Sequence, residues 1–158
     1  FNGLFDAFGA YGGSGATLGL VIALILFSKA KDQKSIAKLS LAPGIFNINE
    51  MVIFGLPIIL NPIYIIPFVL APIVNIIIGY SATCIFKIIP PVAYGVPWTT
   101  PGPLIPFLGT GGNVLALLIG VLCLAVSVLI YAPFVIAAGK ASQVDDDNSE
   151  KDTTEGLA

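Results

Sequence analysis

Long apolar runs separated by short polar segments dominate the sequence. Apolar residues dominate positions 16–27, 63–86 and 113–138. The hydrocarbon core of a bilayer requires about 20 mostly apolar residues in a helix that crosses it. The two longer runs therefore predict spanning helices, and the first run predicts a third span when the preceding residues are included. Within the second run, Asn75 is a polar group that needs a partner.

Two segments between these runs cannot form continuous helices. Residues 43–62 and 87–112 contain closely spaced prolines and glycines, which break a helix. With spans at 63–86 and 113–138, each broken segment has to return to the side that it left, so we expect two re-entrant hairpins dipping towards each other. This arrangement is typical of a transporter with a midplane substrate site. The sequence predicts an all-α integral membrane fold, with about three spanning helices and two re-entrant hairpins, as a fragment of a larger helical transporter.

Positive charge is concentrated after the first apolar run. Residues 28–40 hold four of the seven lysines and only one acid, Asp32, which predicts the cytoplasmic side of a membrane. Apolar residues in this segment permit an interfacial amphipathic helix, and a solvated loop is the equal alternative. Lys140, after the last span, predicts that the C-terminal tail is also cytoplasmic.

The composition supports a membrane protein and limits its partners. Hydrophobic residues make up 56% of the chain, charged residues 10%, and the mean hydropathy is +0.96, whereas soluble domains contain about 25% charged residues. The chain has no arginine, no histidine and no basic stripe, so we expect no nucleic-acid partner. Residues 141–158 hold six of the nine acids, which predicts a disordered cytoplasmic tail beyond a membrane domain at residues 1–140.

Few residues suit covalent or metal chemistry. Cys84 and Cys123 lie in apolar runs and are expected to be small buried hydrophobes. No histidine is present to activate a nucleophile, and no acids or cysteines stand at metal-ligand spacing. We therefore expect no catalytic residue, no metal site and no cofactor.

Glu50 is the charged residue that most needs explanation. It is the only charged residue between Lys38 and Lys87, and a charge at membrane depth costs about 2.5–3.5 kcal/mol even on lenient scales. Irregular backbone at that depth survives only beside protein or a water-filled cavity. We expect Glu50 to line a polar cavity. The alternative is a structural acid at a helix N-terminus.

Two further clusters suit the recognition of a sugar. The indole of Trp98, the only tryptophan, can stack on the apolar face of a sugar, while its hydroxyl groups are bound by Thr99, Thr100, Asn49 and Glu50. The alternative for Trp98 is an interfacial anchor. In the glycine-rich segment before residue 16, the backbone around Gly13 and Ser14 can approach a ligand closely. The alternative there is a turn or a helix-packing surface.

These clusters resemble a known family. The run Phe46-Asn-Ile-Asn-Glu50, followed by Val52-Ile-Phe-Gly-Leu-Pro57, resembles the signature of the membrane permease subunits (enzyme IIC) of the bacterial phosphotransferase system. The closest resemblance is to the lactose/cellobiose/diacetylchitobiose class. Three more motifs agree in order, namely those at residues 12–18, 96–101 and 131–134. The resemblance extends from about residue 1 to 140 and covers the C-terminal part of such a subunit.

The resemblance implies a sugar permease of the bacterial cell membrane that works by group translocation. A disaccharide of the cellobiose, lactose or diacetylchitobiose type would be held in an occluded cavity. It would then be phosphorylated by a separate IIB protein, so the phosphoryl transfer belongs to the partner. A IIA protein is the second expected partner. Glu50 would bind the sugar near the hydroxyl to be phosphorylated, with Trp98 in the same pocket, and the intact permease would be a homodimer in membrane lipid.

One departure from the family and one rival interpretation remain. The family commonly has proline after the glutamate, where this chain has Met51. A proline would restrict Glu50 to extended backbone, so the loop is expected to be looser and the sugar preference altered. The rival is an ion-coupled secondary transporter, in which Glu50 carries a proton or sodium ion.

Overall fold

The computed structural model describes residues 2–155, with side chains described for residues 3–141. Every regular element in these residues is helical, which confirms the predicted all-α class. In chain order the elements are α1 (Asn2–Phe8), η1 (Ser14–Ala16), α2 (Thr17–Phe27), α3 (Lys31–Ile45), α4 (Glu50–Gly55), η2 (Ile58–Leu60), α5 (Pro62–Tyr80), η3 (Ser81–Ile85, a π-helical turn), α6 (Leu104–Gly109) and α7 (Val114–Glu155).

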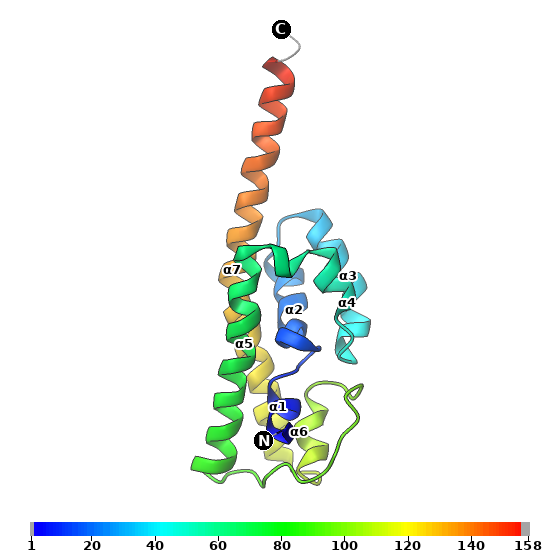
Figure 1. Ribbon diagram of the computed structural model, residues 1–158, viewed down its shortest axis with the longest axis vertical. Coiled ribbons are helices and arrows are strands. Elements are labelled where there is room, and N and C mark those ends of the chain that lie inside the picture. Colours follow the sequence, from blue (N-terminus) through cyan, green and yellow to red (C-terminus); the bar gives the residue numbers. More distant parts are fainter. Residues whose placement is uncertain (1, 156–158) are drawn as a thin grey trace.

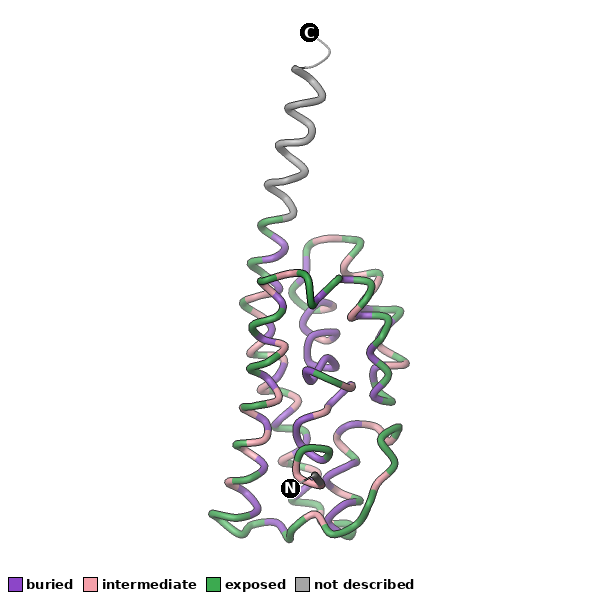
Figure 2. The backbone as a smooth tube through the Cα atoms, in the orientation of Figure 1, coloured by how far each residue is buried: buried purple, intermediate pink, exposed green. Residues whose placement is uncertain are grey.

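Helices α2, α5 and α7 form the core of the molecule, which we call the bundle (Figure 1). The segments Pro62–Ile85 and Val114–Ala141 are long and apolar enough to cross a membrane. They agree with the predicted spans at 63–86 and 113–138. Figure 2 shows α2 buried along most of its length, whereas α5 presents alternating buried and exposed faces. The exposed faces of α5 and α7 carry apolar side chains, with Ile66 on α5 and Leu129 on α7 as examples, as expected for contact with lipid or further protein.

The third expected span is discontinuous. Helix α2 has 11 residues, which at a rise of about 1.5 Å per residue covers roughly half of a 30 Å hydrocarbon core. Helix α1, with seven residues, lies on the other side of the break, below α2 in Figure 1. Between them, Gly12, Gly13 and Gly15 have φ angles of 77°, 90° and 79°, a left-handed backbone that glycine adopts without steric cost and that a helix cannot contain.

Small and polar residues join the helices of the bundle. A Cβ atom on Gly19 would lie 2.6 Å from Cβ of Ser127, so the glycine allows α2 to approach α7 closely. The Asn75 side-chain amide of α5 donates to Ser127 Oγ of α7 at 2.8 Å. Asn75 therefore has the partner that its position in an apolar run required.

Two hairpins approach each other from opposite ends of the molecule (Figure 1). In the first, α3 descends beside α2, the chain turns at residues 46–49, and α4 leads back towards the start of α5. In the second hairpin, a non-helical segment rises after residue 86 and turns near Trp98, and the chain then descends into α6. The expected pair of hairpins is present, and the first one begins earlier than expected. The lysine-rich segment is a helix, and that helix is the descending arm.

Two other expectations differ from the structure. Helix α7 continues to Glu155, where we expected disorder after residue 140, because extending an existing helix avoids the cost of nucleating a new one. Residues 156–158 lie outside the described residues, and the domain boundary stays a prediction. Of the two free cysteines, Cys123 is buried as expected, whereas Cys84 is exposed beyond the last full turn of α5.

Candidate functional site

A cavity of about 340 Å³ lies where the break between α1 and α2 meets the tips of the two hairpins. We call the three segments that meet there, residues 12–15, 47–49 and 96–100, the junction. Pockets for small ligands start at roughly 300 Å³, so the cavity suits a ligand of modest size. Its walls combine carboxylate, amide, hydroxyl and aromatic groups, contributed by Asp6, Ala10, Gly13, Ser14, Asn47, Asn49, Glu50, Val96, Trp98 and Ile105.

Asn47 connects all three segments of the junction. Its Oδ1 accepts from the backbone N–H of Gly12 at 2.7 Å. Its Nδ2 donates to the carbonyl oxygens of Trp98 at 2.5 Å and Thr100 at 3.0 Å. The residue is buried and has a φ of 63°, a left-handed conformation that asparagine tolerates better than most residues. Asn47 therefore positions both the glycine-rich segment and the tryptophan.

Asn49 makes a second link to the glycine-rich segment. Its Nδ2 donates to the carbonyl of Ser14 at 3.0 Å. A Cβ atom on Gly13 would lie 2.6 Å from Cγ of Asn49, so only a glycine leaves room for this contact. The nitrogen of the Asn49 amide thus holds the loop, and Asn49 also lines the cavity.

The bundle supports the glycine-rich segment from the other side. The hydroxyl of Tyr131, on α7, donates to the carbonyl of Gly15 at 2.5 Å. The hydroxyl of Thr17 donates to the carbonyl of Gly12 at 2.5 Å, and the N–H of Leu18 donates to the carbonyl of Tyr11 at 3.1 Å. These contacts satisfy backbone groups that the broken helix cannot pair internally.

Glu50 and Trp98, on different hairpins, line the same cavity. Glu50 is also the first residue of α4, so the alternative of an acid at a helix N-terminus describes its location correctly, and the two interpretations are compatible. Trp98 keeps 68% of its surface exposed, which leaves the indole available to a ligand. A carboxylate and an exposed indole at one cavity are suited to a polyhydroxylated ligand.

The structure brings together five of the seven predicted site residues. Glu50, Asn49, Trp98, Ser14 and Gly13 line the cavity, whereas Thr99 is exposed and is not among the lining residues that the structure describes. The neighbouring Thr100 contributes its carbonyl to Asn47 instead.

Sequence reasoning missed Asp6 as a lining residue. It places a second carboxylate at the cavity, on α1. The available signal was that Asp6 is the only charged residue before Lys29, in a segment made mostly of apolar residues and glycines. Among the described residues, no cluster of three or more histidine, cysteine or acidic side chains is placed to hold a metal ion.

The structure is all-helical in its described residues, has two segments long and apolar enough to cross a membrane, and has a cavity between a broken helix and two hairpin tips. The family model "Phosphotransferase system, EIIC" matches residues 1–72. The chain is 49% identical over 146 residues to the cellobiose-specific EIIC component of the phosphotransferase system of Lactococcus lactis subsp. lactis (strain IL1403), covering 92% of this chain and 29% of that protein. It is 40% identical over 130 residues to the lichenan permease IIC component of Bacillus subtilis (strain 168), covering 82% and 29%.

A solved structure agrees with these relatives. The crystal structure of the transporter ChbC, the IIC component of the N,N'-diacetylchitobiose-specific phosphotransferase system, matches with a TM-score of 0.84 and 40% identity over 90% of this chain and 33% of that chain. This chain belongs to the EIIC components of the phosphotransferase system. It spans less than a third of the length of the two curated relatives named above.

Proposed function

We propose that the cavity at the junction binds the sugar in an EIIC permease that transports a disaccharide of the cellobiose, lactose or diacetylchitobiose type. The observation that carries the proposal is that Glu50 and Trp98, from two separate hairpins, line one cavity of about 340 Å³. The relatives and the solved structure are named for cellobiose, lichenan and diacetylchitobiose, which supports this substrate class.

In the proposed mechanism, the chain's own residues bind and orient the sugar. The indole of Trp98 stacks on the apolar C–H face of the ring, while Glu50 accepts hydrogen bonds from hydroxyl groups on the other side. Asp6 adds a second acceptor and Asn49 offers its side-chain oxygen. No residue of this chain forms a covalent intermediate in this scheme. The phosphoryl group comes from a IIB partner protein, which a IIA protein recharges.

Transport requires the cavity to open alternately to the two sides of the membrane. The junction joins elements that enter from opposite ends, so a movement of either hairpin changes access to the sugar. The proposal further includes a homodimeric assembly in the bacterial cell membrane, with the lysine-rich end of the molecule facing the cytoplasm. The exposed apolar faces of α5 and α7 offer surface for lipid and for a second copy.

The decisive experiment replaces the carboxylate of Glu50 by an amide. Glu50→Gln, introduced into the complete coding sequence that carries this chain, should weaken binding of radiolabelled cellobiose at least about tenfold, because a hydrogen bond to a charged group contributes about 1.5–3 kcal/mol. The matched control is Asp32→Asn, which makes the same chemical change on α3 outside the cavity. Normal binding in Glu50→Gln, with protein present in the membrane, would remove Glu50 from the site.

The energy source of uptake distinguishes the two classes of transporter. Uptake that requires phosphoenolpyruvate and delivers sugar phosphate supports the phosphotransferase proposal. Uptake of unmodified sugar that an uncoupler abolishes would instead support a secondary transporter with Glu50 as the ion carrier.

A further inference from the structure

A second cavity, unrelated to the junction, lies between the end of α2 and α7 at the lysine-rich end of the molecule. Its volume is about 410 Å³. Two lysines, four large apolar side chains, one serine and one glycine line it, namely Leu26, Phe27, Ser28, Lys29, Val135, Ile136, Gly139 and Lys140. No acid is among the lining residues that the structure describes, so the charge at this cavity is positive.

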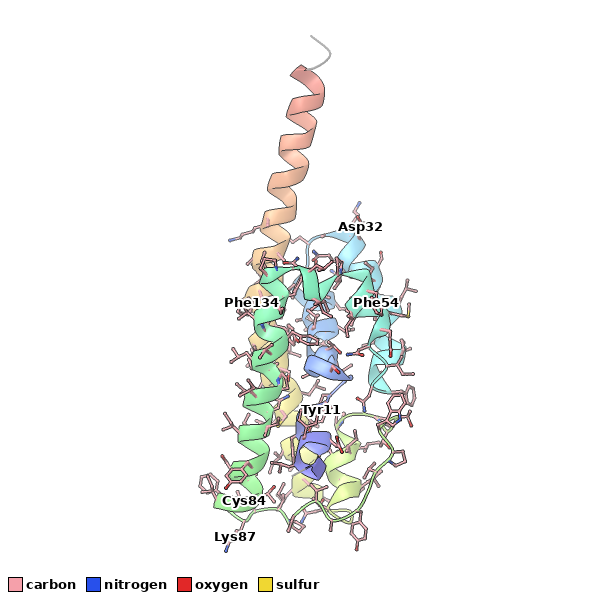
Figure 3. All side chains as sticks on the ribbon, viewed as in Figure 1. Tyr11, Asp32, Phe54, Cys84, Lys87 and Phe134 are labelled. Atoms are coloured by element: carbon pink, nitrogen blue, oxygen red, sulfur yellow. The ribbon has the colours of Figure 1, made fainter. Side chains whose placement is uncertain are left out.

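The cavity lies at the level where the apolar helices end. Helix α2 ends at Phe27, and the apolar segment of α7 ends at Ala141. Lys29 and Lys140 therefore stand at the boundary between the apolar exterior and the polar end of the molecule, the end at which Asp32 lies in Figure 3. In a membrane this boundary coincides with the headgroup layer.

The apolar wall continues onto the outer surface of the bundle. Leu26 is 63% exposed and Ile136 is 44% exposed, and further along α7 Leu129 is also exposed. A molecule held at the lysines can thus extend an apolar chain along the helices without leaving apolar surface. A soluble phosphate or an acidic protein segment would bind the lysines and gain nothing from this wall.

We propose that this cavity binds one anionic phospholipid, with the phosphate between Lys29 and Lys140 and an acyl chain against Leu26 and Ile136. Cationic pockets between membrane helices on the cytoplasmic side recognise anionic headgroups by the same chemistry. The site is separate from the sugar cavity. The proposal depends on the membrane location of the family and not on the proposed sugar specificity.

The test counts lipids that stay bound to the purified product of the complete coding sequence. The protein is titrated with dioleoylphosphatidylglycerol or dioleoylphosphatidylcholine and observed by native mass spectrometry. Because each lysine near an anionic surface contributes about 1 kcal/mol and 1.4 kcal/mol is a factor of ten, Lys29→Gln with Lys140→Gln should weaken retention of the anionic lipid about thirtyfold. Phosphatidylcholine retention should not change.

A matched charge control separates a pocket from general surface attraction. Lys31 and Lys38 lie on α3, the helix that begins at the same end of the molecule, and are not among the lining residues described. Their double change to Gln removes the same charge and should alter retention less than about threefold. Equal losses in both double variants would overturn the proposal, because the effect would then reflect the charge of the whole end.

A steric variant keeps both lysines and fills the cavity. A Cβ atom on Gly139 would meet no heavy atom within 4 Å, and leucine is a better helix former than glycine. Gly139→Leu should therefore leave the helix intact and lower retention of the anionic lipid at least tenfold.

Two further results would overturn the lipid assignment. One is unchanged retention in both the lysine and the glycine variants. The other is competition by glycerol 3-phosphate as strong as that of the whole lipid, because it would show a site for soluble phosphate in which the apolar wall has no part.

Discussion

The bundle and the junction hold their backbone in opposite ways. In the bundle, regular helices pair their own backbone groups, and side chains mainly fill space. In the junction, backbone groups of the three segments are joined by side chains, with Asn47 reaching two segments and Asn49 and Tyr131 reaching the glycine-rich one. Irregular backbone at membrane depth needs such partners. A change in the junction should therefore affect ligand binding far more than an equally drastic change in the bundle.

The largest effect is expected for Asn47→Ala. The change removes three hydrogen bonds worth about 1 kcal/mol each, and alanine at a φ of 63° adds about 1–2 kcal/mol of strain. Binding of cellobiose, measured with the purified full-length protein, should weaken about a hundredfold. Asn47→Gly removes the same bonds without the strain and should be less severe. Normal binding in both variants would show that the junction does not depend on this side chain.

A smaller loss is expected for Gly13→Ala. At a φ of 90°, the new Cβ lies 2.6 Å from Cγ of Asn49, so the side chain of Asn49 has to move. The strain of about 1–2 kcal/mol should weaken sugar binding about tenfold or more. Gly95→Ala is the matched control, because a Cβ there would meet nothing within 4 Å, and its binding should change less than twofold. Equal behaviour of the two variants would contradict close packing at Gly13.

Tyr131→Phe tests the link between the two regions. The hydroxyl belongs to the bundle and donates to Gly15 in the junction at 2.5 Å. Its loss, worth about 1 kcal/mol, should lower the thermal midpoint slightly and weaken sugar binding about fivefold. Tyr80→Phe removes a hydroxyl from an exposed tyrosine of α5 and should alter neither quantity. A fall in stability without any change in binding would show that the bundle does not support the loop.

The bundle was largely predictable from the sequence, because long apolar runs leave few alternatives in a protein with so little charge. The spans at 63–86 and 113–138 agree closely with the helices found. The positions of these spans also predicted the two hairpins, because each broken segment between spans has to return to the side that it left. The sequence did not reveal that the lysine-rich segment is the descending arm of a hairpin, since a helix with few buried residues is hard to distinguish from a solvated loop.

The sequence indicated which residues lie at the junction better than it indicated the contacts that they make there. The isolated charge of Glu50 and the single tryptophan indicated a cavity, and both residues line it. The role of Asn47 depends on contacts with residues 35, 51 and 53 positions away, and such long-range pairing has no periodic signal. Thr99 was expected at the site because it follows Trp98, but adjacent residues on an irregular chain need not face the same side.

The smallest effect is expected for the polar pair that joins α5 and α7. Ser127→Ala leaves the side-chain amide of Asn75 without its acceptor in an apolar setting, so it should lower the thermal midpoint. The carbonyl oxygen Oδ1 of Asn75 is buried and has no partner within the described residues, so replacing Asn75 by leucine removes an existing penalty together with the bond. The double variant Asn75→Leu, Ser127→Ala should therefore be more stable than Ser127→Ala alone.

Polar pairs between membrane helices average about 0.6 kcal/mol, so the differences in stability are expected to be small. They are measured by thermal unfolding, in one detergent, of the unaltered protein, the two single variants and the double variant. Sugar binding should stay within about twofold throughout. A loss of binding as large as that of Asn47→Ala would show that the bundle shapes the cavity as directly as the junction does.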